Sequence, residues 1–331
     1  MQIDVVPFGD TDESAARHAY DISVAAARAR TPDFPSYSFA TFLGGIRRPY
    51  AGRAAERVVA YLAGAPAGFA ELTLPHYDNL DNGTVEIFVH PDRRRRGVGR
   101  RLHGWAVERM QDLGRKRITG ETVQTTEGDA FAAAMGAAPV LLETRSRLDV
   151  TAGAQDGWDA MLAEAWTRAD GYRFVRWTGM PPDGCIDDVA YLDGRLISDA
   201  PTGDLEWEPE KVDADRIRRS EQRMIDLGFD RIHGGIEHVA TGRLVAWTVL
   251  AGHPDVPEHL WQNITLVDPP HRGHRLGMVV KLENLAHARE HRPALAAIDT
   301  WNASSNEHML AINVAMGFRP VDRWMQWQQA V

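Results

Sequence analysis

Two short segments of the chain order their arginines and glycines in a way that suits phosphate binding. The first is Arg94-x-x-Gly97-x-Gly99 and the second is Arg272-x-x-Arg275-x-Gly277. Each follows a strand-like apolar stretch and precedes a stretch of helical periodicity, so each is expected to open a helix. A helix N-terminus offers unpaired backbone N–H groups and a positive dipole end, and both favour a bound anion. Neither segment is a Walker P-loop, because no Gly-Lys-Ser/Thr follows, and the glycine spacing does not fit a dinucleotide fingerprint.

These segments are part of a longer internal repeat. Val85–Leu102 aligns with Asn263–Val280 at one offset (272 − 94 = 178), and Met135-Gly136 aligns with Met316-Gly317 at nearly the same offset (317 − 136 = 181). Two copies are too few for a solenoid and indicate duplicated domains. A chain of 331 residues also exceeds one ordinary hydrophobic core. We therefore expect one domain over residues 1–152 and a second over residues 153–331, the latter with an acidic, irregular insert near residues 180–209.

Both copies show the same order of expected elements. In the first copy these are strand 3–6, helix 12–30, a hairpin of strands 57–62 and 67–74, strand 85–89 after a turn at Asn82-Gly83, helix 98–113, strand 117–122, a helix around 130–135 and a closing strand 141–150. In the second copy they are a hairpin around Thr241-Gly242, strand 263–267, helix 276–290, strand 295–301, helix 306–316 and a closing strand 321–327.

Composition and charge narrow the classes of function. Residues 1–150 carry 19 basic and 19 acidic residues, so the remainder has 37 − 19 = 18 basic against 46 − 19 = 27 acidic residues and the whole net charge of −9. This balance argues against nucleic-acid binding, which needs clustered cations, and is compatible with a cationic small substrate. A single cysteine excludes a disulfide framework, and the sequence shows neither a signal peptide nor a membrane-length apolar run. We expect a cytoplasmic protein, monomeric or homodimeric, without a membrane partner.

The run Val-x-Pro-x-x-Arg-x-x-Gly-x-Gly at Val89–Gly99 resembles the pyrophosphate-binding motif of the GNAT superfamily of N-acetyltransferases. The second copy matches with one departure, since Arg275 stands where the first motif glycine belongs. Downstream, Asn302, Asn306 and Gly317-Phe318 resemble the family's next motif. The resemblance spans both halves, as in mycothiol synthase, a family member with the same doubled architecture. It implies an α/β (α+β) fold of two GNAT-like domains, each a mixed, splayed β-sheet flanked by helices.

The resemblance also implies that acetyl-CoA is the cofactor, with coenzyme A as product, and that it enters where the fourth and fifth strands part. The fourth strand would hold the pantetheine and the loop would hold the pyrophosphate. The residues so implied are Ile87, Phe88, Val89, Arg94, Arg95, Arg96, Gly97, Val98 and Gly99 in the first copy, and Thr265, Leu266, Val267, Arg272, Gly273, His274, Arg275, Leu276, Gly277, Asn302 and Asn306 in the second.

Catalytic residues are less clearly marked. The family's usual acid, a tyrosine, is replaced by Asn313 in the second copy and by Ala132 in the first. The first copy places two carboxylates, Glu71 and Glu86, on the strands that flank the expected acceptor site, whereas the second copy has Ile264 at the position of Glu86. We therefore favour the first copy for chemistry, with Glu86 as the general base and Glu71 as the alternate.

These residues lead to one functional hypothesis and two alternatives. We expect an acetyl-CoA-dependent N-acetyltransferase that acts on a small, cationic amine by direct transfer in a ternary complex. The alternatives are a non-catalytic acetyl-CoA-binding or scaffold protein, suggested by the missing tyrosine, and a mycothiol-synthase-like acetyltransferase. His287, Glu290 and His291 have the spacing of a zinc site, but they fall at the end of an expected helix without an evident third ligand, so no metal is expected.

Overall fold

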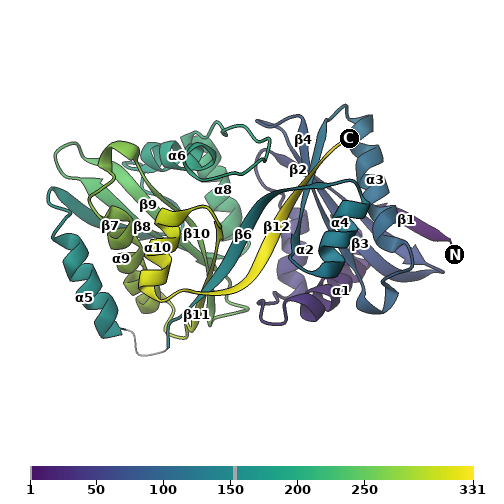
Figure 1. Cartoon of the computed structure of the whole chain (residues 1–331), viewed down its shortest axis with the longest axis horizontal. Helices are drawn as coiled ribbons and strands as arrows, with labels where there is room; N and C mark the ends of the chain where they lie inside the picture. Colours follow the sequence, from purple (N-terminus) through teal and green to yellow (C-terminus); the bar gives the residue numbers. More distant parts are fainter. Residues whose placement is uncertain (1, 152–154) are drawn as a thin grey trace. The chain divides into compact units, whose positions relative to one another are not determined.

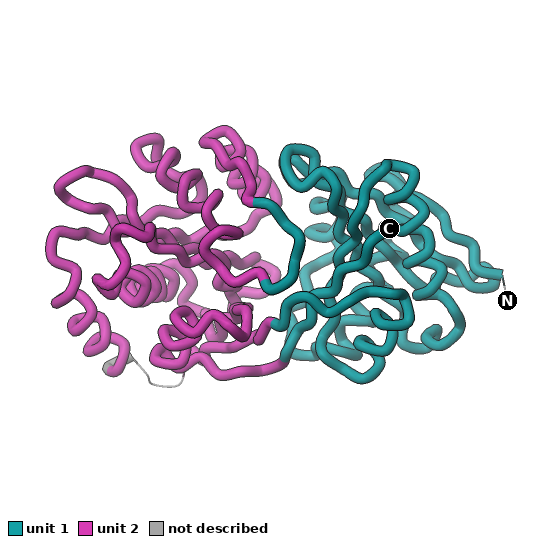
Figure 2. The backbone as a smooth tube through the Cα atoms, turned by 45° about the horizontal axis from the view of Figure 1, so that its top comes forward, with its two compact units in different colours: residues 1–142, 203–208, 323–331 teal, residues 143–202, 209–322 magenta. Residues whose placement is uncertain are grey.

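The computed structural model describes residues 2–151 and 155–331, and its backbone falls into two compact units. Unit 1 comprises residues 1–142, 203–208 and 323–331, and unit 2 comprises residues 143–202 and 209–322 (Figure 2). Each unit therefore includes segments that are distant in sequence. The expected domain boundary between residues 152 and 153 lies outside the described residues.

Unit 1 is a mixed sheet with helices on both faces (Figure 1). Its elements are β1 (Ile3–Phe8), α1 (Glu13–Arg30), α2 (Phe39–Arg47), β2 (Arg53–Leu62), β3 (Ala65–Pro75), β4 (Asn82–Val89), the 3-10 turn η1 (Pro91–Arg93), α3 (Val98–Asp112), β5 (Arg117–Val123), α4 (Thr126–Ala134) and most of β12 (Arg319–Ala330). The strand order is β1-β2-β3-β4-β5-β12, in which only β4 and β5 are parallel. Apolar residues of α1 and α3 pack on opposite faces of this sheet.

Unit 2 repeats this plan. Its elements are most of β6 (Ala138–Asp149), α5 (Gln155–Trp166), β7 (Tyr172–Thr178), α6 (Ile186–Gly194), α7 (Leu196–Asp199), α8 (Ala214–Asp226), β8 (Asp230–His238), β9 (Arg243–Gly252), β10 (His259–Val267), η2 (Pro269–His271), α9 (Leu276–His291), β11 (Ala297–Ala303) and α10 (Glu307–Met316). The strand order is β7-β8-β9-β10-β11-β6, with β10 and β11 parallel. Helix α9 covers one face, and α6 and α8 cover the other.

The last strands are exchanged between the two copies of the repeat. Strand β6 was expected to close the first copy, but its residues 143–149 pair with β11 of the second copy. Conversely, residues 324–330 of β12 pair with β5 of the first copy. Buried charges explain the partner of β6: Arg145 and Arg147 both bond to Asp299 of β11, at distances of 2.6–3.0 Å. An unpaired buried charge is costly, so this match favours β6 beside β11.

Both sheets are splayed, as expected. The parallel register of β4 and β5 covers only Asn82–Thr84 against Arg117–Thr119, although both strands continue. In unit 2, β10 and β11 pair only over His259–Trp261 and then part. The far halves of β4 and β10 therefore keep one edge free of a parallel neighbour. An extended ligand can bond to such an edge as an added strand does.

Three local expectations were wrong. Asn82-Gly83 is the start of β4 and no turn; a side chain at Gly83 would collide with Met110 of α3, so glycine is needed there for close packing. Helix α2 was not expected at all. The insert is partly helical, because Ile186, Val189 and Leu192 recur at helical spacing and bury one face of α6. Among residues 2–151 and 155–331, no helix is long and apolar enough to span a membrane.

Candidate active site

The first phosphate-binding candidate is a loop that leads from β4 through η1 into α3. Gly97 is the N-cap of α3 and adopts the left-handed conformation at φ 85°. Among the described residues, the backbone N–H groups of Arg95–Gly99 form no hydrogen bond within the protein. They are therefore available to an anion at the positive end of the helix dipole. The next motif glycine, Gly99, allows close packing, since a Cβ there would lie 3.1 Å from the Phe131 ring.

The second loop has the same backbone despite its departure in sequence. Arg275 occupies the N-cap of α9 at φ 59°, and Gly273 two residues earlier has φ 87°. The first loop has the reverse order, with Arg95 at φ 59° and Gly97 at φ 85°. Both loops thus place left-handed residues at the same two positions, and each has one glycine there. Because only one position per loop carries the cost of a side chain in this conformation, the substitution at Arg275 is compatible with the loop.

The two loops differ in charge compensation. In the part of the chain that the structure describes, Arg94, Arg95 and Arg96 are exposed and form no ion pair. In unit 2, Arg272 donates to Asp199 at 2.9 Å and to the Val267 carbonyl at 3.1 Å. Arg275 lies 3.7 Å from Glu164. The arginines of the first loop are therefore better able to attract a phosphate.

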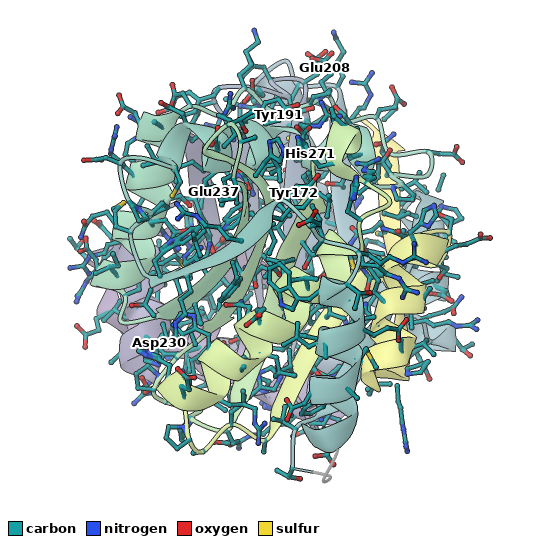
Figure 3. All side chains as sticks on the ribbon, turned by 90° about the vertical axis from the view of Figure 1, so that its left-hand side faces the viewer. Tyr172, Tyr191, Glu208, Asp230, Glu237 and His271 are labelled. Carbon is teal, nitrogen blue, oxygen red and sulfur yellow. The ribbon has the colours of Figure 1, made fainter. Side chains whose placement is uncertain are left out.

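Aromatic side chains also crowd the second loop. Tyr172 and His271 lie side by side (Figure 3), with His271 Nδ1 2.9 Å from the hydroxyl of Tyr172. Tyr172 also contacts the rings of His274 and His238. Burial, followed by the neighbouring His238, lowers the pKa of His271, so its ring is less readily protonated. The expected ligands His274, Leu276 and Gly277 lie on this loop and at the start of α9; Leu276 and Gly277 are buried.

The fourth-strand residues lie as expected beside the splay. Ile87, Phe88 and Val89 end β4, beyond its last pairing with β5, and Thr265, Leu266 and Val267 end β10. On their other edge these segments pair with β3 and β9. The side chains of Phe88 and Leu266 point into the core on one face, and Phe88 stacks on Phe69 at 5.9 Å. These residues can therefore bind a cofactor through the backbone edge that faces the splay.

Three charged side chains form a row across the sheet of unit 1. Arg57, Glu71 and Glu86 are register partners on β2, β3 and β4, so they point to the same face, the one covered by α1. Arg57 pairs with Glu71. Glu86 has no hydrogen-bond or ion-pair partner among the described residues. Its side chain is exposed, yet the surrounding protein desolvates it; this effect, with Glu71 and Glu121, raises its pKa to about 7.

The three corresponding positions in unit 2 carry no carboxylate that could accept a proton. The positions of Arg57, Glu71 and Glu86 are taken by His233, Val249 and Ile264, with Val249 buried in an apolar cluster under α6. His233 is fully buried between the rings of Trp177 and Trp247, and burial lowers its pKa. A β-bulge also interrupts the pairing of β10 with β9 between Gln262 and Thr265. Among these six described positions, carboxylates occur only in unit 1, and that of Glu86 is exposed.

The two asparagines expected to hold coenzyme A have partners within unit 2. Asn306 caps α10 by accepting from the Met309 amide at 3.2 Å. Asn302 accepts a 2.7 Å hydrogen bond from Asn313, the residue at the tyrosine position, and Asn313 in turn accepts from Lys281 at 2.8 Å. Lys281 is only 2% exposed, and its burial lowers the pKa of the amine to about 7. Sequence reasoning missed Lys281, Arg57 and Asp199, because each matters through a contact that no local motif marks.

Comparison with known proteins identifies the family. The family described as Acetyltransferase (GNAT) family matches residues 19–136. The mycothiol acetyltransferase of Thermomonospora curvata is 30% identical over 261 residues, which are 77% of this chain and 76% of that protein. The chain belongs to the GNAT family of acetyltransferases.

Solved structures extend this finding to the whole chain. A tandem GNAT protein from the clavulanic acid biosynthesis pathway, determined without AcCoA, shares 29% identity with a TM-score of 0.83, covering 99% of this chain and 98% of that one. A GCN5-related N-acetyltransferase from Sphaerobacter thermophilus shares the fold, with 15% identity, a TM-score of 0.66 and coverage of 99% and 95%. This GNAT protein is thus an N-acetyltransferase with two tandem GNAT domains, each a splayed mixed sheet flanked by helices.

Proposed function

We propose that unit 1 transfers the acetyl group of acetyl-CoA directly to a small cationic amine, with Glu86 as the general base. The observation that carries this proposal is the unpartnered, desolvated carboxylate of Glu86 beside the splay of β4 and β5. Its pKa of about 7 suits a group that must accept a proton near neutral pH. Glu71 is the alternate base, but its carboxylate is already paired with Arg57.

The residues of unit 1 fit acetyl-CoA. The N–H groups of Arg95, Arg96, Gly97, Val98 and Gly99 lack acceptors among the described residues and would hold the pyrophosphate, with Arg94 as an exposed cation beside it. The free edge of β4 at Ile87–Val89 would hold the pantetheine. When bound, acetyl-CoA supplies an acetyl group activated as a thioester.

The chain's own residues then handle charge and protons. Glu86 removes a proton from the acceptor ammonium, so that the neutral amine can attack, and Glu71 and Glu86 together attract a cation. The tyrosine position is occupied by Ala132, so the leaving thiolate departs without a proton from that residue. The acidic net charge of the chain supports an activity that involves neither nucleic acid nor a membrane. We further propose that the protein acts in the cytoplasm as a monomer or homodimer.

Unit 2 supports a second acetyl-CoA site less well. Its loop has the required backbone, but Asp199 already compensates Arg272, and its fourth strand faces an apolar cluster. The expected ligands Gly273, Arg275, Asn302 and Asn306 would hold a weaker or non-catalytic site. A purely non-catalytic protein would be indicated if the purified chain bound acetyl-CoA but acetylated no amine. The similarity to a mycothiol acetyltransferase favours that enzyme's acceptor as a second candidate substrate, to be included in an amine panel.

Calorimetric titration with acetyl-CoA tests the assignment of the cofactor to unit 1. We expect Arg94→Ala to weaken binding by about 10-fold, as for the loss of a charge-assisted contact to phosphate. The matched variant Arg272→Ala should change the affinity less than about 3-fold, because Arg272 is already held by Asp199. The reverse order of the two effects would place the main site in unit 2, and no binding by the wild-type protein would refute the proposed cofactor.

A further inference from the structure

The face of unit 1 that carries Glu86 continues across the splay to a second carboxylate. Thr84 of β4 and Thr119 of β5 are the last paired residues, and their hydroxyls lie 3.0 Å apart. Glu86 and Glu121 each follow two residues later, so they point to the same face from strands that have parted. Paired strands lie about 4.8 Å apart, and Glu86 and Glu121 are on strands separated by more than that. Glu121 is nevertheless close enough to contribute to the raised pKa of Glu86.

The exchanged strand β12 completes this face. Gln326 is the register partner of Glu121 and donates to its carboxylate at 2.9 Å, which fixes the orientation of the acid. Two residues earlier on the same face, Trp324 stacks on Phe34 of the α1–α2 connection at 5.6 Å. Trp324 is buried, whereas Phe34 retains exposed surface. The face therefore offers an apolar ring near an oriented carboxylate.

Charge interactions connect this carboxylate to the cofactor loop. Burial lowers the pKa of Arg30, at the end of α1; the neighbouring charge of Arg94 adds to this effect and that of Glu121 opposes it. Arg30 thus interacts electrostatically both with the loop that would hold the pyrophosphate and with Glu121. The segment 203–208 stabilises the same sheet, because Glu206 pairs with Arg117 of β5 at 2.6 Å and bonds to Gln328 of β12. Strand β12 is therefore held where it can contribute to a site.

We propose that the acceptor is an aliphatic diamine whose second ammonium binds Glu121. The inference rests on the proposed function, since it needs Glu86 to activate the first amine. One ammonium lies at Glu86 and loses its proton there, while the other remains charged at Glu121, and the connecting methylene groups contact Phe34. The separation of the parted strands requires a linker of several methylene groups between the two nitrogens. Gln326 is a positioning residue that acts through Glu121.

The test compares 1,4-diaminobutane with butylamine, which has the same carbon chain and one ammonium fewer. At pH 8.5, where Glu86 is ionised, we expect the wild-type enzyme to acetylate the diamine with at least 10-fold higher kcat/KM. Glu121→Gln should lower kcat/KM for the diamine by 10-fold or more, mainly through KM, and affect butylamine several-fold less. Gln326→Leu should raise KM for the diamine with little change in kcat. The control Glu108→Gln, at an exposed site on α3, should leave both substrates unaffected.

The possible results distinguish a failure of the diamine assignment from a failure of the proposed function. A wild-type enzyme that acetylates both amines equally, or a Glu121→Gln variant that loses activity equally on both, overturns the diamine assignment and leaves the proposed function intact. A wild-type protein that acetylates neither these amines nor any of a wider panel overturns both. Calorimetry with 1,4-diaminobutane in the presence of coenzyme A gives a second readout, in which Glu121→Gln is expected to weaken binding about 10-fold.

Discussion

Replacing Glu86 by glutamine is expected to lower kcat for acetyl transfer by about 10²–10⁴-fold, the usual contribution of a general base. The amide keeps the size of the side chain but cannot accept the proton of the acceptor ammonium. Acetyl-CoA affinity should stay within a few-fold of the wild-type value, because Glu86 points to the α1 face of the sheet and not to the loop before α3. Steady-state kinetics and calorimetry on the same preparation measure both quantities.

The pH profile gives this prediction a second readout. A base with a pKa of about 7 must be ionised to act, so wild-type kcat should rise with pH through about 7 and then level off. In Glu86→Gln this rise should disappear. The raised pKa also means that the folded protein binds a proton at Glu86 more tightly than the unfolded chain does, so the stability cost of ionising Glu86 grows from about pH 4.5 to about pH 7 and is constant above that. The variant should therefore unfold at the same or a higher temperature at pH 8. That result would exclude misfolding as the cause of lost activity.

Glu71→Gln is the control that separates the two carboxylates. Glu71 is paired with Arg57, so its loss should reduce kcat less than the loss of Glu86. It should also lower the pH at which kcat rises, because the charge of Glu71 contributes to the raised pKa of Glu86. If Glu86→Gln keeps the wild-type rate and Glu71→Gln abolishes it, the roles of the two carboxylates are exchanged.

The parts of the site that local chemistry dictates were predictable from sequence. Few backbone conformations can connect a strand, through a proline and a glycine-bearing turn, to a helix. Both loops adopt the expected conformation. The departure at Arg275 was visible in the sequence, but its compensation by Gly273 was not, because it requires the φ angles of both loops. The sequence placed Glu71 and Glu86 on strands that flank the expected acceptor site, whereas their alignment in one row with Arg57 depended on the registers of β2, β3 and β4.

Long-range features were beyond the sequence. Strands β6 and β12 are the final strands of two similar copies, so the order of elements assigns each strand to its own copy. The pairing of β6 with β11 depends on Asp299, more than 140 residues away from Arg145, and the pairing of β12 with β5 on contacts such as Trp327 with Thr122. The contribution of Gln326 to the face of Glu86 follows only from this exchange. Alignment of the two repeats does not predict that β12 joins the sheet of the first copy.

Removing the carboxylate of Asp299 is expected to destabilise unit 2 by about 3 kcal/mol, within the range for breaking a buried ion pair. Asp299 is fully buried and accepts from both Arg145 and Arg147, with His259 3.3 Å away. Asp299→Ala would leave Arg145, also fully buried, still paired with Asp322, which keeps the cost at the lower end of the range. Urea unfolding at pH 7 measures the effect.

The surface pair of Glu290 with Arg176 provides the matched control in the same unit, and Glu290→Ala should cost no more than about 1 kcal/mol. The pH dependence follows from the pKa of Asp299, which burial would raise but which its bonds to Arg147 and His259 hold well below the usual value. The stabilisation by Asp299 is therefore complete above about pH 4, the range of an unfolded carboxyl, and is lost as the pH falls through the lower folded pKa. Asp299→Asn should lack this component of acid unfolding. Equal losses for Asp299→Ala and Glu290→Ala would show that the buried network does not hold β6 beside β11.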